Sequence, residues 1–116
     1  MTQPIVHITH RDEWALAQLS GEYRPGSLSE EGFIHCSKPD QVVRVAGTFL
    51  AGQHGLVLLV IDSKRLLAEV RWEPGADSPA ELFPHIYGPL NLDAVTQVLD
   101  LNPSPDGQYV LPNINP

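Results

Sequence analysis

Apolar and polar residues alternate or recur at regular spacings along the chain, and these patterns predict its elements. Residues 5–9 alternate between apolar and polar side chains and predict a first strand. Residues 11–19 predict a helix, because Thr9 can cap its amino end and Gly21 follows its carboxyl end. Residues 22–29 contain turn-forming residues and predict a loop.

A second strand and a second helix are predicted next. Residues 32–36 predict a short strand, and Ser37 is placed to cap a helix whose first turn contains Pro39. Apolar side chains recur at the spacing of one helical face, at Val42, Val45, Ala46, Phe49 and Leu50. We expect this face to pack against the core.

The second half of the chain is rich in predicted strands. Leu56–Ile61 is apolar at every position, which is typical of a strand buried on both faces. Residues 69–73 and 95–101 predict two further strands, the latter after a turn at 92–94. Residues 83–90 predict an edge or irregular strand, because proline occurs there twice and lacks the N–H that a central strand uses.

Predicted helices lie in the first half of the chain and most predicted strands in the second half, which indicates an α+β fold. The length of 116 residues fits a single domain, residues 1–116, with a core at about 5–101 and a proline-rich C-terminal segment at 102–116. The apolar fraction of 42% is enough for a packed core, and 11 Pro with 9 Gly fit many short elements joined by turns.

The net charge, the first residues and the lengths of the apolar runs limit the classes of partner that we expect. The net charge is −7, from 7 Lys and Arg against 14 Asp and Glu, and the cations are scattered singly except at Lys64 and Arg65. Binding to nucleic acid needs clustered cations, so we expect no nucleic-acid partner. The first residues lack the pattern of a secretory signal, and no apolar run is long enough to span a bilayer. We therefore expect a cytoplasmic protein with no membrane partner.

Strand periodicity places similar side chains on one face of two predicted strands. Alternate residues of a strand point to opposite faces. In 32–37, one face carries Phe33, His35 and Ser37, and the core face carries Ile34 and Cys36. In 83–87, the corresponding residues are Phe83, His85 and Tyr87, with Ile86 toward the core.

A third strand adds a carboxylate to this face. In residues 69–73, Val70 and Trp72 suit the core, and Glu73 points away from it. If the strands are neighbours, one cleft would be lined by His7, His35, Glu73, His85 and Tyr87. Aromatic planes with imidazoles and a carboxylate suit a flat polar ligand, such as a nucleotide or nicotinamide, and acid–base chemistry.

Simpler interpretations remain open for each residue. The histidines could be ordinary surface groups, and Ser37 could serve only as a helix cap. A zinc site from three histidines lacks the usual ligand spacings, and we expect no metal. The single cysteine, Cys36, faces the core, which disfavours it as a nucleophile, and Ser37 lacks the glycine pattern of a serine hydrolase.

Four segments together resemble a known family. They are GFIHCS at 32–37, FPHIYGPL at 83–90, Gly-Glu-Tyr-Arg at 21–24, and Trp14 on the first helix. Over roughly residues 5–101 the chain resembles the bacterial family called domain of unknown function 952. That family is similar in fold to the ADP-ribosyltransferases, which bind NAD in a cleft between two small sheets. Within that group it looks most like the tRNA 2′-phosphotransferase branch.

The resemblance implies residue roles and a reaction. It implies antiparallel or mixed strands in two small sheets, two short early helices, and NAD as a substrate without a metal. Ligand binding would fall to His7, Tyr23, Phe33, Ser37, Tyr87 and Gly88. Catalysis would fall to His35, Glu73 and His85, with Glu73 stabilising the ribosyl cation and a histidine handling a proton. Arg24 and Arg71 are candidates for holding phosphates.

The expected function is ADP-ribosyl transfer or NAD glycohydrolysis on a small-molecule substrate. Two alternatives remain open. One is a catalytically inactive module that binds a nucleotide or another metabolite, and the other is a protein-interaction domain with an apolar patch around Phe33 and Phe83.

Overall fold

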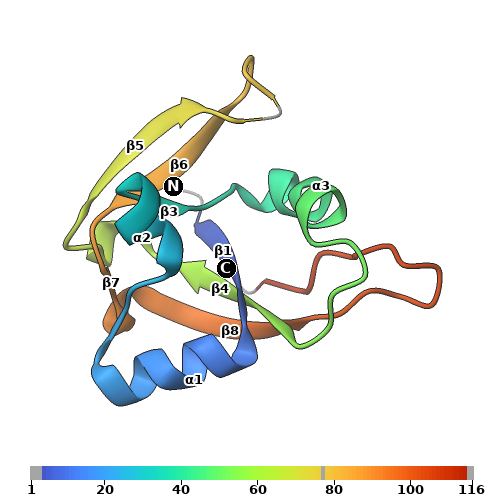
Figure 1. The fold of residues 1–116 in the computed structure, drawn as a ribbon, viewed down its shortest axis with the longest axis horizontal. Helices are drawn as coiled ribbons and strands as arrows, with labels where there is room; N and C mark the ends of the chain where they lie inside the picture. Colours follow the sequence, from blue (N-terminus) through green and yellow to red (C-terminus); the bar gives the residue numbers. More distant parts are fainter. Residues whose placement is uncertain (1–3, 77, 115–116) are drawn as a thin grey trace.

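The computed structural model describes residues 4–76 and 78–114 and has the α+β fold that the sequence predicts (Figure 1). The helices are α1 (Arg11–Ser20), α2 (Gly26–Glu31) and α3 (Pro39–Phe49). The strands are β1 (Ile5–His10), β2 (Glu22–Tyr23), β3 (Ile34–His35), β4 (Leu56–Ile61), β5 (Glu69–Pro74), β6 (Leu82–Tyr87), β7 (Leu90–Asn91) and β8 (Val95–Leu101). Two short 3-10 helices are η1 (Ser63–Arg65) and η2 (Leu92–Ala94).

The strands in the described ranges form three antiparallel sheets. β4 lies between β1 and β8, β6 lies between β3 and β5, and β2 pairs with β7. A backbone bridge joins the first two sheets, because Val6 and Ser37 each donate an N–H to the other's carbonyl oxygen at 2.8 Å. The segment that follows β3 is therefore fixed against β1.

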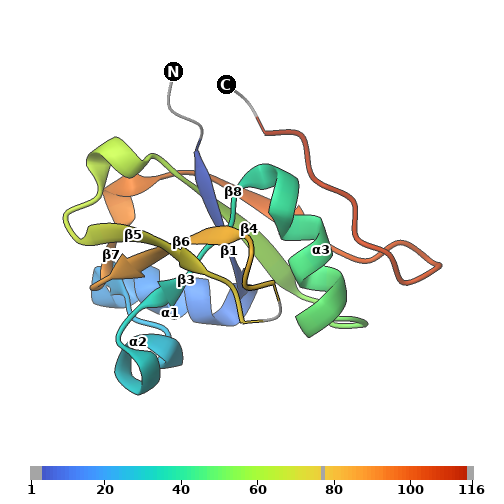
Figure 2. The ribbon, with the colours of Figure 1, turned by 90° about the horizontal axis from the view of Figure 1, so that it is seen from above.

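The central strand β4 contributes to two hydrophobic cores, one on each face of its sheet. One face carries Val57, Leu59 and Ile61, which pack with Trp14 of α1 and with Ile34 and Ile86. The other face carries Leu56, Leu58 and Val60, which pack with Val42 and Ala46 of α3 and with Tyr109. Figures 1 and 2 show α3 on one side of the molecule and the β5–β6 hairpin on the other. The prediction that Leu56–Ile61 is buried on both faces is confirmed.

The first helix begins at Arg11 as predicted and ends at Ser20, one residue later than predicted, and its N-cap residue differs from the prediction. Gly21 adopts a left-handed conformation, with φ of 97°, and its N–H donates to the carbonyl of Ala17. The residue at the N-cap position is His10, not Thr9. The Thr9 hydroxyl instead donates to the Glu13 carboxylate at 3.1 Å.

Helix α3 begins one residue later than predicted. The N-cap residue is Lys38, not Ser37, and the Gln41 side-chain oxygen accepts the Lys38 N–H at 2.9 Å. The backbone of Ser37 is already used by its bridge to Val6. The helix therefore leaves the Ser37 side chain without a capping role.

Two short elements occupy the region predicted as a loop. β2 has two residues and α2 has six, and α2 has no buried residue. The described chain therefore has three α-helices where two were expected, because such short elements carry no apolar periodicity. None of the helices in these ranges is long and apolar enough to cross a membrane.

The proline-containing strand β6 is central in its sheet, so the prediction of an edge position is wrong. Pairing with β3 ends at His35 opposite His85, one residue before Pro84 would have to donate an N–H. Only the carbonyl of Pro84 is used there, as the acceptor for the Cys36 N–H at 3.1 Å. Trp72, opposite Pro84, is 48% exposed, so its predicted place in the core is also wrong.

The C-terminal segment packs against α3. The Tyr109 side chain is buried, and its hydroxyl donates toward two carbonyl oxygens just beyond α3, Leu50 at 2.6 Å and Gln53 at 2.9 Å. Figure 2 shows the segment running alongside α3. It thereby helps to cover the second core.

Candidate functional site

A pocket of about 600 Å³ lies where β1, β3, β6 and α3 meet. The wall formed by α3 and its carboxyl end is apolar, with Val42, Val45, Phe49 and Leu50. The facing wall carries the imidazoles of His35 and His85 and the phenyl rings of Phe33 and Phe83. The pocket thus combines an apolar wall with a wall that can exchange protons.

The imidazole of His85 is held by a carboxylate on the neighbouring strand. Nδ1 of His85 lies 2.8 Å from Oε1 of Glu73, and the Tyr87 hydroxyl donates to the same oxygen at 2.5 Å. These two hydrogen bonds hold the pKa of Glu73 below its usual value, with the Tyr87 bond the larger cause. The bond to Glu73 in turn raises the pKa of Tyr87.

The second ring nitrogen of His85 is free to meet a ligand. Because the Glu73 carboxylate is ionised and only accepts, Nδ1 of His85 carries the donated proton. Nε2 makes no hydrogen bond within the described residues, although the residue is only 6% exposed. No fully buried side-chain nitrogen or oxygen in those ranges lacks a partner, so Nε2 is accessible, and His85 lines the pocket.

Ser37 presents a second polar atom in the same way. The residue is 5% exposed and lines the pocket, and its backbone is held by β1. Its hydroxyl has no hydrogen-bond partner among the residues described, and no fully buried polar side-chain atom there is unpaired. The Oγ atom is therefore accessible as a donor or acceptor for a bound molecule.

Aromatic side chains surround His85. The ring of Phe33 stacks on the His85 imidazole, with centroids 4.2 Å apart and an interplanar angle of 20°. Phe33 also lies 4.8 Å from the His35 ring and 5.3 Å from the Tyr87 ring. His35 itself pairs with the Glu31 carboxylate of α2 at the pocket wall.

His7 lines the pocket, but both of its ring nitrogens are used within the protein. Nδ1 lies 2.5 Å from the backbone carbonyl of His35, and Nε2 lies 2.8 Å from the Tyr23 hydroxyl. A carbonyl can only accept, so Nδ1 carries the proton and Nε2 accepts from Tyr23. Burial lowers the pKa of His7 to about 4 and raises that of Tyr23 to about 12, so both groups are neutral at pH 7.

The structure brings most of the predicted site residues together. Ring contacts, hydrogen bonds or the pocket wall connect His7, Phe33, His35, Ser37, Glu73, His85 and Tyr87. Glu73 and Tyr87 lie behind His85 and are not themselves part of the pocket wall. Neither Tyr23 nor Gly88 lines this pocket. The Tyr23 hydroxyl bonds to His7, and a Cβ on Gly88 would lie 2.9 Å from that of Ala68.

Neither arginine suggested for phosphate binding lines this pocket. Arg24 pairs with Glu22, and Arg71 pairs with Glu69 while its guanidinium lies 4.3 Å from the centroid of the Tyr87 ring. Sequence reasoning missed Glu31 because α2 was not predicted. It assigned the apolar face of α3 to the core, although Phe49 is 55% exposed at the pocket.

Two other chemistries find no support in the site. No group of three or more His, Cys, Asp or Glu in the described ranges could hold a metal ion. Cys36 is buried, and burial raises the pKa of its thiol well above the usual range, so it is not a ready thiolate.

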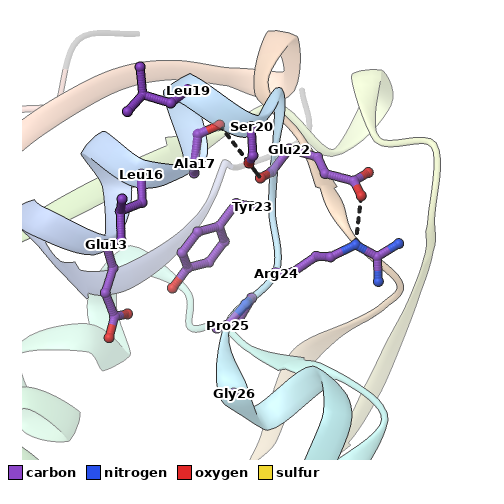
Figure 3. Close-up of a pocket in the computed structure, with 10 residues that line it drawn as sticks. All are labelled: Glu13, Leu16, Ala17, Leu19, Ser20, Glu22, Tyr23, Arg24, Pro25 and Gly26. Carbon is purple, nitrogen blue, oxygen red and sulfur yellow. Dashed lines mark hydrogen bonds and ion pairs between the residues drawn. The ribbon is translucent and has the colours of Figure 1, made fainter.

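A second hollow of about 650 Å³ lies beside α1 (Figure 3). Leu16 and Leu19 of α1 line one side, and the ion pair of Glu22 and Arg24 lies across from them. The hollow has no imidazole in its wall, whereas the pocket at His85 has three. The pocket is therefore the better candidate for chemistry.

Comparisons with known proteins give a family and similar solved structures. The family described as protein of unknown function (DUF952) matches residues 8–98. The crystal structure of protein CC0527 from Caulobacter crescentus is similar, with 33% identity, a TM-score of 0.83, and coverage of 94% of this chain and 95% of that chain. The solution NMR structure of CC0527 gives 32% identity, a TM-score of 0.79, and coverage of 92% and 91%.

The comparison with curated proteins finds no match. The match to the family, in contrast, spans most of the chain, and a solved relative shares its fold at more than 30% identity. The chain belongs to the DUF952 family of proteins of unknown function.

Proposed function

We propose that this chain is an enzyme that cleaves or transfers the N-glycosidic bond of a nucleotide such as NAD, or of its nucleoside, in the pocket at His85. The observation that carries the proposal is a pair of accessible polar atoms on almost fully buried residues, His85 Nε2 and Ser37 Oγ. Both residues are almost fully buried, yet each leaves one polar atom accessible at the pocket, where a ligand can form a hydrogen bond to it. The choice of bond follows the resemblance of the sequence to ADP-ribosyltransferases.

The size and walls of the pocket suit such a ligand. Small-molecule sites usually measure about 300–1,000 Å³ and combine apolar walls with a few polar groups. The side chains of Val45 and Phe49 offer an apolar surface for a flat heteroaromatic ring. Ser37 would then hydrogen-bond a ribose hydroxyl or the ring amide.

The reaction needs one proton acceptor. In hydrolysis, the bond between ribose C1′ and the nicotinamide nitrogen breaks, and its electron pair leaves with the nitrogen, which becomes neutral. The oxygen of a water molecule bonds to C1′, and the proton of that water passes to Nε2 of His85. In transfer, the hydroxyl of a small acceptor takes the place of water.

Glu73 has a different role in this proposal from the one that the sequence suggested. It lies behind His85, so it orients the ring through Nδ1 and stabilises the imidazolium that forms. Among the described residues that line the pocket, the carboxylate is that of Glu31, whose negative charge would favour a positively charged ribosyl transition state. His7 supports the pocket, because its ring nitrogens are already bonded.

The test is release of nicotinamide from NAD and from nicotinamide riboside. The wild-type protein should release nicotinamide, and His85→Asn should lower the rate by about 100-fold or more, the usual contribution of a general base. His54→Asn, an exposed histidine outside the pocket, is the matched control and should keep the wild-type rate. Saturable binding of NAD without release of nicotinamide would contradict the enzymatic function. It would favour a module that binds a metabolite without catalysis.

A further inference from the structure

We infer that the pocket selects a phosphate-free nucleoside, uncharged or cationic in its base, over the corresponding nucleotide. The inference rests on the proposed function and narrows its substrate class. It predicts that the ribosyl-base half of a ligand enters the pocket and that no phosphate is held there.

The charges in the pocket wall are the first argument. None of the described residues that line the pocket is a lysine or arginine, whereas the Glu31 carboxylate belongs to its wall. A second carboxylate, Glu73, bonds to His85 directly behind the wall. A phosphate would therefore meet negative charge, whereas a pyridinium ring would be attracted.

The histidines do not change this balance. His35 pairs with Glu31, and His85 bonds to Glu73. Each imidazole therefore lies beside a carboxylate and adds no uncompensated positive charge to the pocket. His7 is held neutral by burial, which lowers its pKa to about 4.

The arginines of the chain are engaged in ion pairs outside the pocket wall. All five arginines form ion pairs, Arg11 with Asp100, Arg24 with Glu22, Arg44 with Glu81, Arg65 with Asp62 and Arg71 with Glu69. Lys38 follows Ser37 but is not part of the pocket wall. The amino end of α3 does not favour an anion either. Its first turn contains the negative charge of Asp40, and the Lys38 N–H already donates to the Gln41 side chain.

The experiment compares two ligands that differ by one phosphate. Calorimetric titration of the wild-type protein should show that nicotinamide riboside binds about tenfold or more tightly than nicotinamide mononucleotide. Equal binding, or tighter binding of the mononucleotide, would overturn the inference while leaving the proposed function in place. If neither ligand nor NAD binds, the proposed function itself is wrong, and the inference goes with it.

A positive charge introduced into the pocket wall tests the same preference in a second way. Phe49→Lys puts a cation on an exposed pocket residue, and the preference for the riboside should shrink to about threefold or less. Leu19→Lys changes the net charge equally at an 86% exposed position on α1 and should leave the preference unchanged. An unchanged preference in Phe49→Lys would contradict selection by the pocket charges.

Discussion

Two histidines that line the same pocket differ in what their ring nitrogens can do. Both ring nitrogens of His7 are bonded inside the protein, to a carbonyl and to the Tyr23 hydroxyl. His85 uses only Nδ1, and its Nε2 is accessible. The sequence placed both in the candidate site, because strand periodicity predicts the face of a residue. It cannot predict which atoms across that face will be bonded to it.

The buried His7 makes stability depend on pH. Its pKa is about 4 in the folded protein and near 6.5 when unfolded, so between these values only the unfolded chain binds the proton. The free energy of unfolding should rise by on the order of 3 kcal/mol as pH increases through this window and stay constant above it, as far as His7 is concerned.

Urea unfolding at about pH 7 and about pH 5 checks this prediction. His7→Gln removes the titrating group, so the difference in unfolding free energy between the two pH values should be smaller than in wild type. His10→Gln, at the exposed end of the same strand, should keep the wild-type difference. If His7→Gln shows the full difference, another group is responsible.

The role of Glu73 can be separated from that of a nearby carboxylate. Glu73→Gln should lower nicotinamide release by about tenfold or more, because an amide stabilises the imidazolium of His85 less well than a carboxylate. Glu69→Gln, on the same strand but paired with Arg71, should stay within about twofold of wild type. The measurement is the steady-state rate of nicotinamide release by both variants. Equal rates would contradict the role of Glu73 in orienting His85.

At the scale of elements, long and strongly patterned segments were predictable, and several short ones were not. The apolar run of β4 and the residues of β8 are where the pattern places them. β2, β7 and α2 have two, two and six residues, too few to show a period. Pro84 led to the wrong prediction of an edge position for β6. A proline fits this central strand because the pairing with β3 ends before Pro84 would have to donate an N–H.

The hairpin between β5 and β6 depends on one glycine. A Cβ on Gly75 would lie 2.4 Å from Cε1 of Phe83, a buried ring of the pocket wall. Gly75→Ala should therefore lower the free energy of unfolding by about 1–3 kcal/mol and change the pocket. Gly47 lies in α3, and a Cβ added there would meet open space. Gly47→Ala should therefore raise the free energy of unfolding by about 0.5–1 kcal/mol. Thermal unfolding of both variants is the measurement, and effects of the same sign would contradict this account.

At the scale of the whole molecule, one sheet separates two cores, and the pocket lies where that sheet meets the second sheet and α3. The α+β class followed from the order of the elements. The meeting of the sheets did not, because the bridge between Val6 and Ser37 is a long-range backbone contact without a side-chain pattern. The packing of the C-terminal segment on α3 was equally invisible, since it depends on Tyr109.

Tyr109→Phe tests how firmly that segment is held. Loss of the hydroxyl proton that is shared between two backbone carbonyls just beyond α3 should lower the free energy of unfolding by about 1 kcal/mol. Val110→Ala changes the neighbouring residue, which is exposed, and should have little effect. Chemical denaturation of the two variants gives the comparison, and an unchanged Tyr109→Phe would show that the hydrogen bonds contribute nothing to stability.

The most direct test of the central claim is to locate the bound ligand by NMR. With increasing nicotinamide riboside, backbone amide signals of Phe33, Ser37, Phe49 and His85 should shift together and saturate. Signals from Leu16 and Leu19, at the hollow beside α1, should stay in place. Shifts confined to α1, or no saturable shift with either the riboside or NAD, would contradict a ligand site at His85.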